Sequence, residues 1–331
     1  MPIINMDDKI LLSHGGGGKK TQDLIRHIFL EKFSNEELNE LDDGAVIGDM
    51  IITTDSFVVN PLFFPGGDIG KLSISGTVND IVAMGGTPLF LSAGFIIEEG
   101  FPLEDLKKIV DSMSNEAKAV PVKIVTGDTK VVEKGKGDGI YINTTGFGKK
   151  TLELGLERIK PGNKIIITGT VGDHGASILL SRNQFEIESG LKSDCAPLYG
   201  LLKSILSEDI KFMRDPTRGG LAAVLNEIVR KDWGIEIFED KIPIREDVKG
   251  ICEMLGIDPI TMANEGKMVI FVEGDRVEET LKTLHMHPLG RDASIIGKVT
   301  DQIKGRVVER TVAGTTRIID MPSGESLPRI C

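Results

Sequence analysis

Short apolar runs typical of strands alternate along the chain with longer segments whose apolar residues recur at helical spacing. Residues 45–59, AVIGDMIITTDSFVV, are rich in β-branched side chains and predict a strand. Residues 68–85 predict a helix whose apolar face consists of Ile74, Val78, Ile81 and Val82. At ~100° per residue, Asp80 then points away from that face, where it is available for chemistry rather than packing.

The second half of the chain repeats this mixture of elements. Three further apolar runs predict strands, at residues 164–172, 268–274 and 293–299. Residues 215–232, DPTRGGLAAVLNEIVRKD, predict the clearest helix, with Asp215 as its cap and Pro216 in its first turn. Its apolar face would consist of Leu221, Val224, Leu225, Ile228 and Val229. The pattern predicts an α/β protein, of the α+β kind with mixed sheets.

A polar segment, KKTLELGLERIKPGNK, separates the two halves. A chain of 331 residues accommodates two domains at ~150 residues each. We therefore predict one domain at 1–150 and a second at 151–320, followed by a tail at 321–331. Residues 311–322 are strand-like, and the last segment, SGESLPRIC, is expected to be an unstructured tail.

Composition excludes several classes of partner and location. The net charge of −11 argues against nucleic acid and anionic membranes, which select basic surfaces. The longest apolar stretch, LFLSAGFII, is far shorter than the ~20 residues of a membrane span. The N-terminus, MPIINMDDKI, lacks the pattern of a signal peptide. The 3 cysteines are odd in number and widely separated, so we expect a reducing cytoplasm rather than a disulfide framework or a zinc site.

The glycine-rich segment SHGGGGKKT (13–21) precedes a predicted amphipathic helix with Leu24, Ile25, Ile28 and Phe29 on its apolar face. It does not match the P-loop, because Ser13 stands in place of the first glycine and Lys20 in place of the hydroxyl residue. Two interpretations remain: a mobile loop, or a flexible lid that accepts an anion.

Acidic residues next to glycines recur through the first half. They are Asp42, Asp43, Asp55, Asp80 and Asp128. Single acids in turns are usually caps or solvated residues. Several that follow apolar strands could instead hold Mg²⁺, which prefers oxygen donors and binds through a few carboxylates together with substrate phosphates.

Two motifs of the second half could also carry chemistry. The segment DPTRGG (215–220) could place a phosphate at a helix start, or could be a plain capped helix. In MANEGKM (262–268), Glu265 and Lys267 could be solvated charges, or Glu265 could be a base facing a nucleotide. The five histidines show no metal-ligand spacing, and we expect His285 and His287 at the surface.

The chain ends on a cysteine, Cys331. It could be incidental or a lipidation site, although no CaaX box is present and the tail lacks the polybasic companion of a stable anchor. It could also be a covalent carrier, because the segment from Pro322 onward extends to roughly 30 Å. Thiolates are good nucleophiles that form labile acyl-type adducts.

Taken in order, the motifs HGGGG, DDGAVI, TTDSFVVNPLFFPGGDIGKLSISGTVNDIVAMGG, GDTKVV, INTTGFG, RDPTRGGLA, NEGK and PRIC resemble the HypE family of hydrogenase maturation factors. More distantly, the chain resembles aminoimidazole ribonucleotide synthetase, selenophosphate synthetase and thiamine-monophosphate kinase. The resemblance runs nearly end to end, and the terminal PRIC separates the HypE family from the others.

This resemblance implies a PurM-like two-domain fold, with N-terminal strands that form a dimeric barrel in a homodimer, and a flexible C-terminal tail. It implies that the acidic and glycine-rich motifs bind ATP. The implied nucleotide-binding residues are Asp43, Asp55, Asp80, Asp128, Asn79, Asp215, Gly219 and Gly220. The implied Mg²⁺ ligands are Asp43, Asp55, Asp80 and Asp128.

The resemblance also implies the chemistry. A HypF-type carbamoyltransferase loads Cys331 with a carbamoyl group, ATP phosphorylates the amide oxygen, and loss of phosphate leaves a thiocyanate. The cyano group then passes to iron on a HypC–HypD scaffold, as a cyanide ligand of [NiFe] hydrogenase. We expect Glu265 to be the base and Lys130 to position groups or shuttle protons. Because the tail offers no obvious local base, we expect the Cys331 thiol to be activated inside the partner's site.

Two alternatives remain. The chain could be an ATP-dependent small-molecule kinase or synthetase of the same superfamily, with Cys331 incidental. It could also be a docking module that performs no catalysis, whose tail is only a recognition peptide.

Overall fold

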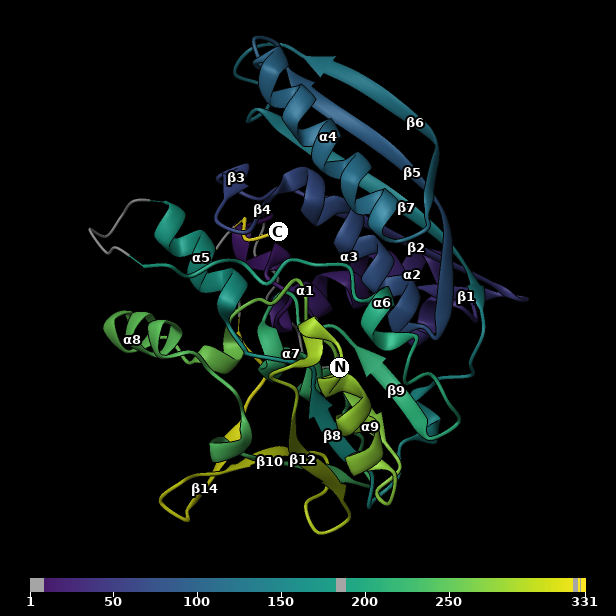
Figure 1. The fold of residues 1–331 in the computed structure, drawn as a ribbon, viewed down its shortest axis with the longest axis vertical. Helices are drawn as coiled ribbons and strands as arrows, with labels where there is room; N and C mark the ends of the chain where they lie inside the picture. The colour runs from purple at the N-terminus through teal and green to yellow at the C-terminus, as the bar shows by residue number, and fades with distance from the viewer. Residues whose placement is uncertain (1–8, 183–188, 324–326, 328) are drawn as a thin grey trace.

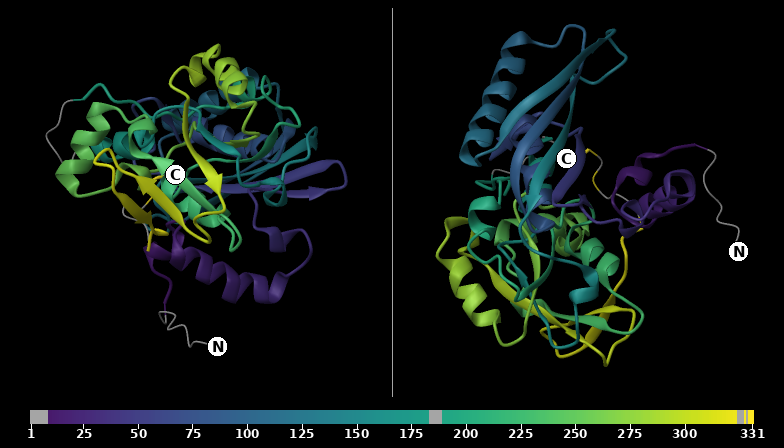
Figure 2. Two further views of the ribbon diagram at one scale, coloured as in Figure 1. Left: turned by 90° about the horizontal axis from the view of Figure 1, so that it is seen from below. Right: turned by 90° about the vertical axis from the view of Figure 1, so that its right-hand side faces the viewer.

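The described residues form two large β-sheets, one in each half, and a two-stranded hairpin, with helices packed between and around the large sheets (Figure 1). This computed structural model describes residues 9–182, 189–323, 327 and 329–331. A helical N-terminal segment stands off the body (Figure 2). Its elements are η1 (Leu12–Gly15), α1 (Lys19–Leu24), η2 (Ile25–Phe29), α2 (Leu30–Phe33) and η3 (Leu38–Glu40).

The first sheet has the order β1-β2-β7-β5-β6. All of its pairs are antiparallel except β5–β6, whose parallel pairing is made by the α4 crossover. Its elements are β1 (Ala45–Ile47), β2 (Met50–Phe57), α3 (Ile69–Ala83), β5 (Gly86–Glu98), α4 (Leu103–Ala119), β6 (Lys123–Val132) and β7 (Ile140–Lys150). A short hairpin, β3 (Phe63–Phe64) and β4 (Gly67–Asp68), precedes α3.

The second sheet has the order β14-β13-β10-β12-β8-β11-β9, with only β10–β13 parallel. Its strands are β8 (Lys164–Ile167), β9 (Ile210–Arg214), β10 (Gly234–Phe238), β11 (Val269–Val272), β12 (Ser294–Thr300), β13 (Val307–Arg310) and β14 (Thr316–Ile319). The helices of this half are α5 (Asp173–Ser181), α6 (Tyr199–Leu202), α7 (Gly220–Ile228), α8 (Glu246–Leu255) and α9 (Val277–His285). Short 3₁₀ turns complete it: η4 (Leu156–Arg158), η5 (Glu239–Lys241), η6 (Pro259–Thr261) and η7 (Pro288–Gly290).

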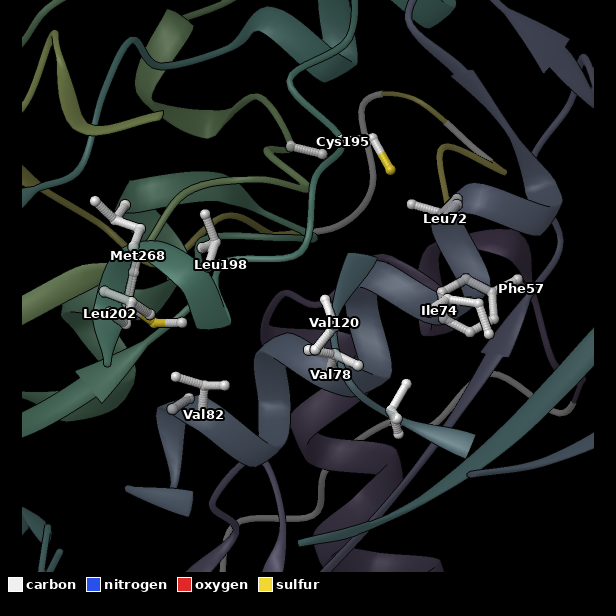
Figure 3. Packing of buried hydrophobic residues seen from close by; sticks show 14 of the residues in the cluster. Phe57, Leu72, Ile74, Val78, Val82, Val120, Cys195, Leu198, Leu202 and Met268 are labelled. Atoms are coloured by element: carbon white, nitrogen blue, oxygen red, sulfur yellow. The ribbon is translucent and has the colours of Figure 1, made fainter. Parts of the chain in front are cut away.

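Helix α3 joins the two halves. Asp68 caps it by accepting hydrogen bonds from the N–H groups of Gly70 and Lys71, at 2.7 and 3.0 Å. The predicted apolar face is confirmed, because its four members are fully buried. Nearly all of the rest of α3 is buried too, because the helix lies between the first sheet and the second half. Val78 and Val82 belong to the same core cluster as Leu198 and Leu202 of the second half (labelled in Figure 3). The two halves therefore share one apolar core, and Asp80 at the end of α3 faces their junction rather than solvent.

Two predicted elements differ from the structure. The expected continuous strand at 45–59 is a hairpin, because Gly48, with φ +65°, turns the chain between β1 and β2. The strand-like segment 311–322 is likewise interrupted, and only β14 within it is a strand.

The helix expected from Asp215 begins five residues later, at Gly220, so its predicted cap is wrong. Gly219 and Gly220 have φ of +76° and +61°, which L side chains rarely adopt, and the segment before them is not helical. Asp215 is thereby left to face the junction between the halves.

The expectation of an unstructured tail is wrong for its last residues, and 324–326 and 328 lie outside the described residues. Residues 329–331 run antiparallel to 58–60: the Val58 N–H donates to the Cys331 carbonyl at 3.0 Å and the Asn60 N–H to the Arg329 carbonyl at 3.1 Å. Ile330 is 3% exposed and belongs to the shared core. Burial of the Ile330 side chain favours docking of the last residues, which the polar composition of the tail did not predict.

Neither sheet closes on itself within the described residues, so the expected barrel is not present in one copy of the chain. In that same part of the chain, no helix is both long and apolar enough to cross a membrane.

Candidate active site

Five carboxylates from separate segments gather at the junction of the halves. We call Asp43, Asp55, Asp80, Asp215 and Glu265 the acid cluster. Thr53 on β2 connects two of its segments, because its hydroxyl lies 2.7 Å from an Asp80 carboxylate oxygen and 2.7 Å from the Asp43 carbonyl. The end of β2, the end of α3 and the β9–α7 loop thus supply side chains to one place.

Burial and mutual repulsion shape the protonation of this cluster. Burial raises the pKa of Asp80 well above its ordinary value, and Asp215, Asp55 and Asp43 raise it further. Burial likewise raises the pKa of Asp215, with Asp43 and Asp55 as the main neighbours. Ionisation of one member of the cluster therefore disfavours ionisation of the others, and a divalent cation bound among them would relieve this repulsion.

Arg214, at the end of β9, holds one side of the cluster. Its Nε donates to Asp43 at 2.9 Å and its NH2 to the Leu41 carbonyl at 2.8 Å. Burial opposes its charge, but Asp43, Glu227 and Asp42 outweigh burial and raise the pKa of the guanidinium. Arg214 therefore stays charged and fixes the entry of the chain into β1.

Glu265 is the most enclosed predicted catalytic residue. It is 3% exposed, and its Oε1 has no hydrogen-bond partner among the residues that the structure describes. Burial raises the pKa of its carboxyl well above normal, with Asp215, Asp55 and Asp194 contributing. Such a carboxyl can accept a proton from a substrate near neutral pH.

Asn79 is occupied by structural contacts. Its Nδ2 donates to the Ala196 carbonyl at 3.1 Å and to the Glu265 carbonyl at 3.4 Å, and its Oδ1 accepts from the Leu198 N–H at 2.7 Å. Asn79 therefore ties α3 to the segment beside Glu265, and its amide is engaged with protein rather than directed at a ligand.

The glycine-rich N-terminal loop lies over the DPTRGG loop. A Cβ on Gly17 would meet the Arg218 backbone carbonyl at 2.7 Å, and Arg218 NH1 donates to the Gly15 carbonyl at 3.2 Å. The packing of Gly220 is similarly tight, because a Cβ there would meet the Met262 carbonyl at 2.4 Å. The two interpretations of the N-terminal loop were a mobile loop and a lid that accepts an anion. Its close packing on the DPTRGG loop favours the lid.

Asp128 and Lys130 lie apart from the acid cluster. Both are on the edge strand β6, and both side chains are 68% exposed. The Lys130 Nζ donates to Asp128 at 2.8 Å, and this hydrogen bond lowers the pKa of Asp128. A single copy of the chain therefore brings Asp43, Asp55 and Asp80 together but leaves the fourth predicted ligand and the predicted Lys130 outside.

Among the described residues, no three carboxylates, histidines or cysteines converge closely enough to form a complete metal site. The acid cluster instead offers hard oxygen donors. This donor set suits Mg²⁺, which keeps several waters and completes its shell with substrate phosphates.

Cys331 lies against the chain just beyond the strand that carries Asp55. Its carbonyl is bonded to Val58, three residues beyond Asp55, and its side chain is half-buried against the shared core. The Arg329 side chain secures this position, because its Nε donates to the Val58 carbonyl at 2.9 Å and it pairs with Asp138. Figure 1 places the C-terminus at the junction, close to β4.

Sequence reasoning missed residues that the structure places here. Arg214 and Arg218 stand inside or next to the RDPTRGG motif, so that motif was the available signal. His174, which has no metal-ligand spacing, contacts the tail. Its segment, VGDHGA (171–176), indicated only a turn before a helix.

Comparisons with known proteins fit this geometry. The models of the AIR synthase related protein match the chain over residues 41–149 (N-terminal domain) and 160–309 (C-terminal domain). Carbamoyl dehydratase HypE of Rhizobium leguminosarum bv. viciae is 46% identical over 98% of this chain and 95% of its own length. That of Escherichia coli K12 is 44% identical over 98% and 100%. The chain belongs to the HypE family of carbamoyl dehydratases. Membership assigns it an enzymatic role in hydrogenase maturation.

Solved structures of the HypE family share its fold. A chain of a HypE–HypF complex matches with a TM-score of 0.87 and 50% identity, covering 90% of this chain and 99% of that one. A HypE protein in complex with ATP matches with a TM-score of 0.82 and 41% identity, covering 98% and 100%. A thiamine monophosphate kinase complexed with AMPPCP and TMP, 19% identical with a TM-score of 0.70, shares the fold.

Proposed function

We propose that this member of the HypE family uses ATP to dehydrate an S-carbamoyl group, carried on its own Cys331, to a thiocyanate. The observation that supports this most directly is the docked C-terminus, whose Cys331 carbonyl is bonded to Val58, three residues from Asp55 of the acid cluster. A thiol on a tail that docks next to the strand carrying Asp55 can present its own adduct to the nucleotide site, which is what a self-carried substrate requires.

The chemistry explains why a nucleotide is needed. The oxygen of a carboxamide is a poor leaving group, and transfer of the terminal phosphoryl group of ATP to that oxygen makes it leave as phosphate. Loss of the two amide protons then leaves a carbon–nitrogen triple bond on the sulfur. Each turnover therefore requires phosphoryl transfer and a proton acceptor.

Asp43, Asp55 and Asp80, with Asp215 beside them, are the residues that we propose to hold Mg²⁺. When bound, this ion neutralises charge on the transferring phosphoryl group. The protein's own part is to hold these carboxylates rigidly, through Thr53 and Arg214, and to exclude water by packing the N-terminal loop over the DPTRGG loop. We include Gly219 and Gly220 in the nucleotide site because their glycine-only conformation brings backbone close to a ligand.

We propose Glu265 as the proton acceptor because its carboxyl is buried, has an oxygen without a partner among the described residues and has a raised pKa. From the family resemblance we still propose Asp128 as a Mg²⁺ ligand and Lys130 as a residue that positions groups or shuttles protons. Both roles require that the tail or a second copy of the chain approach the exposed strand β6. We propose that Asn79 supports the nucleotide site indirectly, by holding α3 against the segment that contains Ala196.

Three associations complete the proposal. The relative crystallised with HypF supports loading of Cys331 by a HypF-type carbamoyltransferase, where we expect its thiol to be activated. We propose transfer of the cyano group to a HypC–HypD iron scaffold, and a homodimer in which the first sheets of two copies form a barrel. We propose that all of this takes place in the cytoplasm.

Intact-mass spectrometry tests the function. Incubation with the carbamoyl-transferring partner should add one carbamoyl group to the C-terminal peptide, and ATP with Mg²⁺ should then remove one water from it. Cys331→Ser should carry no adduct. A loaded peptide whose mass stays constant with ATP would contradict the proposal. If the chain instead were a small-molecule kinase or synthetase, deletion of residues 323–331 would leave its turnover intact.

A further inference from the structure

A buried histidine connects the docked tail to the segment that holds Glu265. His174 lies in the first turn of α5 and is fully buried. It is outside the acid cluster, and the proposed chemistry does not use it. Its two ring nitrogens contact two segments that are far apart in the sequence.

The first contact is with the tail. The His174 Nε2 lies 2.7 Å from the Ile330 carbonyl oxygen. Because a carbonyl only accepts, Nε2 must carry the proton. This is the last tail carbonyl before Cys331, so the bond fixes where the sulfur-bearing residue begins.

The second contact is with residues 193–195. The His174 Nδ1 lies 2.8 Å from the Ser193 hydroxyl, which itself accepts the Cys195 N–H at 3.0 Å. With the ring proton on Nε2, Nδ1 accepts from the serine hydroxyl. The ring therefore has a donor on the tail side and an acceptor on the loop side, and burial lowers its pKa, which keeps it in this neutral form.

The same segment holds the backbone of Glu265. Asp194 accepts the Glu265 N–H at 3.1 Å and forms an ion pair with Lys267 at 3.3 Å. Residues Ser193 to Cys195 also line a cavity of about 540 Å³. The segment is open on its cavity side, and on its other side it is held by the buried Cys195, by the bond from the Ser193 N–H to the Pro65 carbonyl at 2.8 Å and by His174.

We propose that His174 is a positioning residue that couples docking of the tail to the placement of Glu265. A docked Ile330 orients the ring, the ring holds Ser193, and the Ser193–Cys195 segment holds the Glu265 backbone. The catalytic meaning rests on the proposed function, whereas the coupling itself is a property of the folded chain that is measured without turnover.

The other contacts of the tail do not share this property. Arg329 binds the Val58 carbonyl and Asp138, and the backbone bonds run to residues 58–60. Arg182, at the end of α5, also donates to the Arg329 carbonyl at 3.0 Å. These contacts hold the tail without involving Ser193. Changes to these contacts would therefore loosen the tail while the hydrogen bond between His174 and Ser193 stays intact.

The test measures the alkylation rate of Cys331 by mass spectrometry in the full-length protein, which reports tail docking. Ser193→Ala removes the donor to His174 without touching the tail. We expect it to speed alkylation of Cys331 roughly three- to tenfold, the effect of losing one buried hydrogen bond. Ser181→Ala is the matched control, because this serine on the same helix bonds the Ser177 carbonyl at 2.7 Å, a group that neither Ser193 nor the tail contacts. Equal rates in Ser193→Ala and Ser181→Ala would overturn the proposal.

Two substitutions of His174 separate its contacts. A glutamine amide reaches the position of Nε2, whereas an asparagine amide reaches only that of Nδ1. We therefore expect His174→Gln to keep Cys331 protected while amide hydrogen exchange at 193–195 and Glu265 accelerates. We expect the opposite for His174→Asn. Compared with His174→Gln, Cys331 should be alkylated faster and the amides of residues 193–195 should exchange more slowly. Unchanged exchange at Glu265 in both variants would overturn the coupling.

Turnover provides a separate readout. In Ser193→Ala we expect kcat for dehydration of pre-carbamoylated protein to fall while the KM for ATP stays constant, because Glu265 moves and the acid cluster does not. If no variant and no wild type dehydrates the adduct, the proposed function fails, and the alkylation and exchange results still decide the coupling.

Discussion

Asp80 and Asp128 come from motifs of the same kind, each an acid following a small or amide residue in the first half, yet they lie in opposite environments. Asp80 ends a helix that is buried on both sides, and burial with three neighbouring carboxylates raises its pKa. Asp128 lies on an exposed edge strand, where its hydrogen bond to Lys130 lowers its pKa. An acidic motif therefore does not define its own chemistry. Desolvation and like-charged neighbours do, and both come from the fold.

Removal of Asp80 should have the largest effect. Asp80→Asn deletes a carboxylate from the centre of the cluster, and we expect ATP-dependent dehydration to fall by roughly 10³-fold or more, because charge on the phosphoryl group is left uncompensated. The same change relieves repulsion, so the ATP-free protein should melt roughly 2–4 °C higher. Single-turnover assays and calorimetry check the two effects. Lower activity with lower stability would instead indicate misfolding.

Glu265→Gln tests the same buried environment at the proposed base. We expect dehydration of pre-carbamoylated protein to fall by roughly 10²–10⁴-fold, the range for loss of a general base, while ATP still binds. Mass spectrometry of the tail peptide and ATP titration measure the two. Full dehydration in this variant would remove Glu265 from the mechanism.

The pH dependence of stability compares the two environments directly. Carboxyls whose pKa is raised on folding, such as Asp80 and Asp215, stabilise the fold at low pH, and this contribution is lost as pH rises through the raised pKa. Without Mg²⁺, the free energy of unfolding should therefore fall more steeply in wild type than in Asp80→Asn as pH rises from the ordinary carboxyl range toward the raised pKa values. Added Mg²⁺ should stabilise wild type most at the upper end of this range. Parallel curves for the two proteins would mean that the cluster is already neutralised.

Asp128→Asn should have the smallest effect. In the monomeric protein we expect an unchanged melting temperature and unchanged stabilisation by Mg²⁺, because its carboxylate is exposed and paired with Lys130 rather than with the acid cluster. Thermal melts across a range of protein concentrations provide the test. An effect that appears only at high concentration would place Asp128 at the cluster of a second copy, and one as large as that of Asp80→Asn in the monomer would break the comparison.

Much of the fold followed from local pattern. The helix at 68–85 was predicted to within two residues, because its apolar spacing and its Asp68 cap are local features. The helix at 215–232 was placed too early, because a sequence pattern does not reveal that Gly219 and Gly220 take positive φ. The tail was expected to be unstructured because its composition is polar. The composition does not show that Ile330 is buried in a core built from both halves.

The sequence by itself determined the family, the alternation of elements and the chemical inventory of the site, since motif order and side-chain type are properties of the chain alone. Only the tertiary structure decided which acids share a buried space, that Asn79 is a tie, and that His174 lies between the tail and Glu265. The reason is that these hydrogen bonds join residues 71 to 156 positions apart, and no local sequence pattern records their approach.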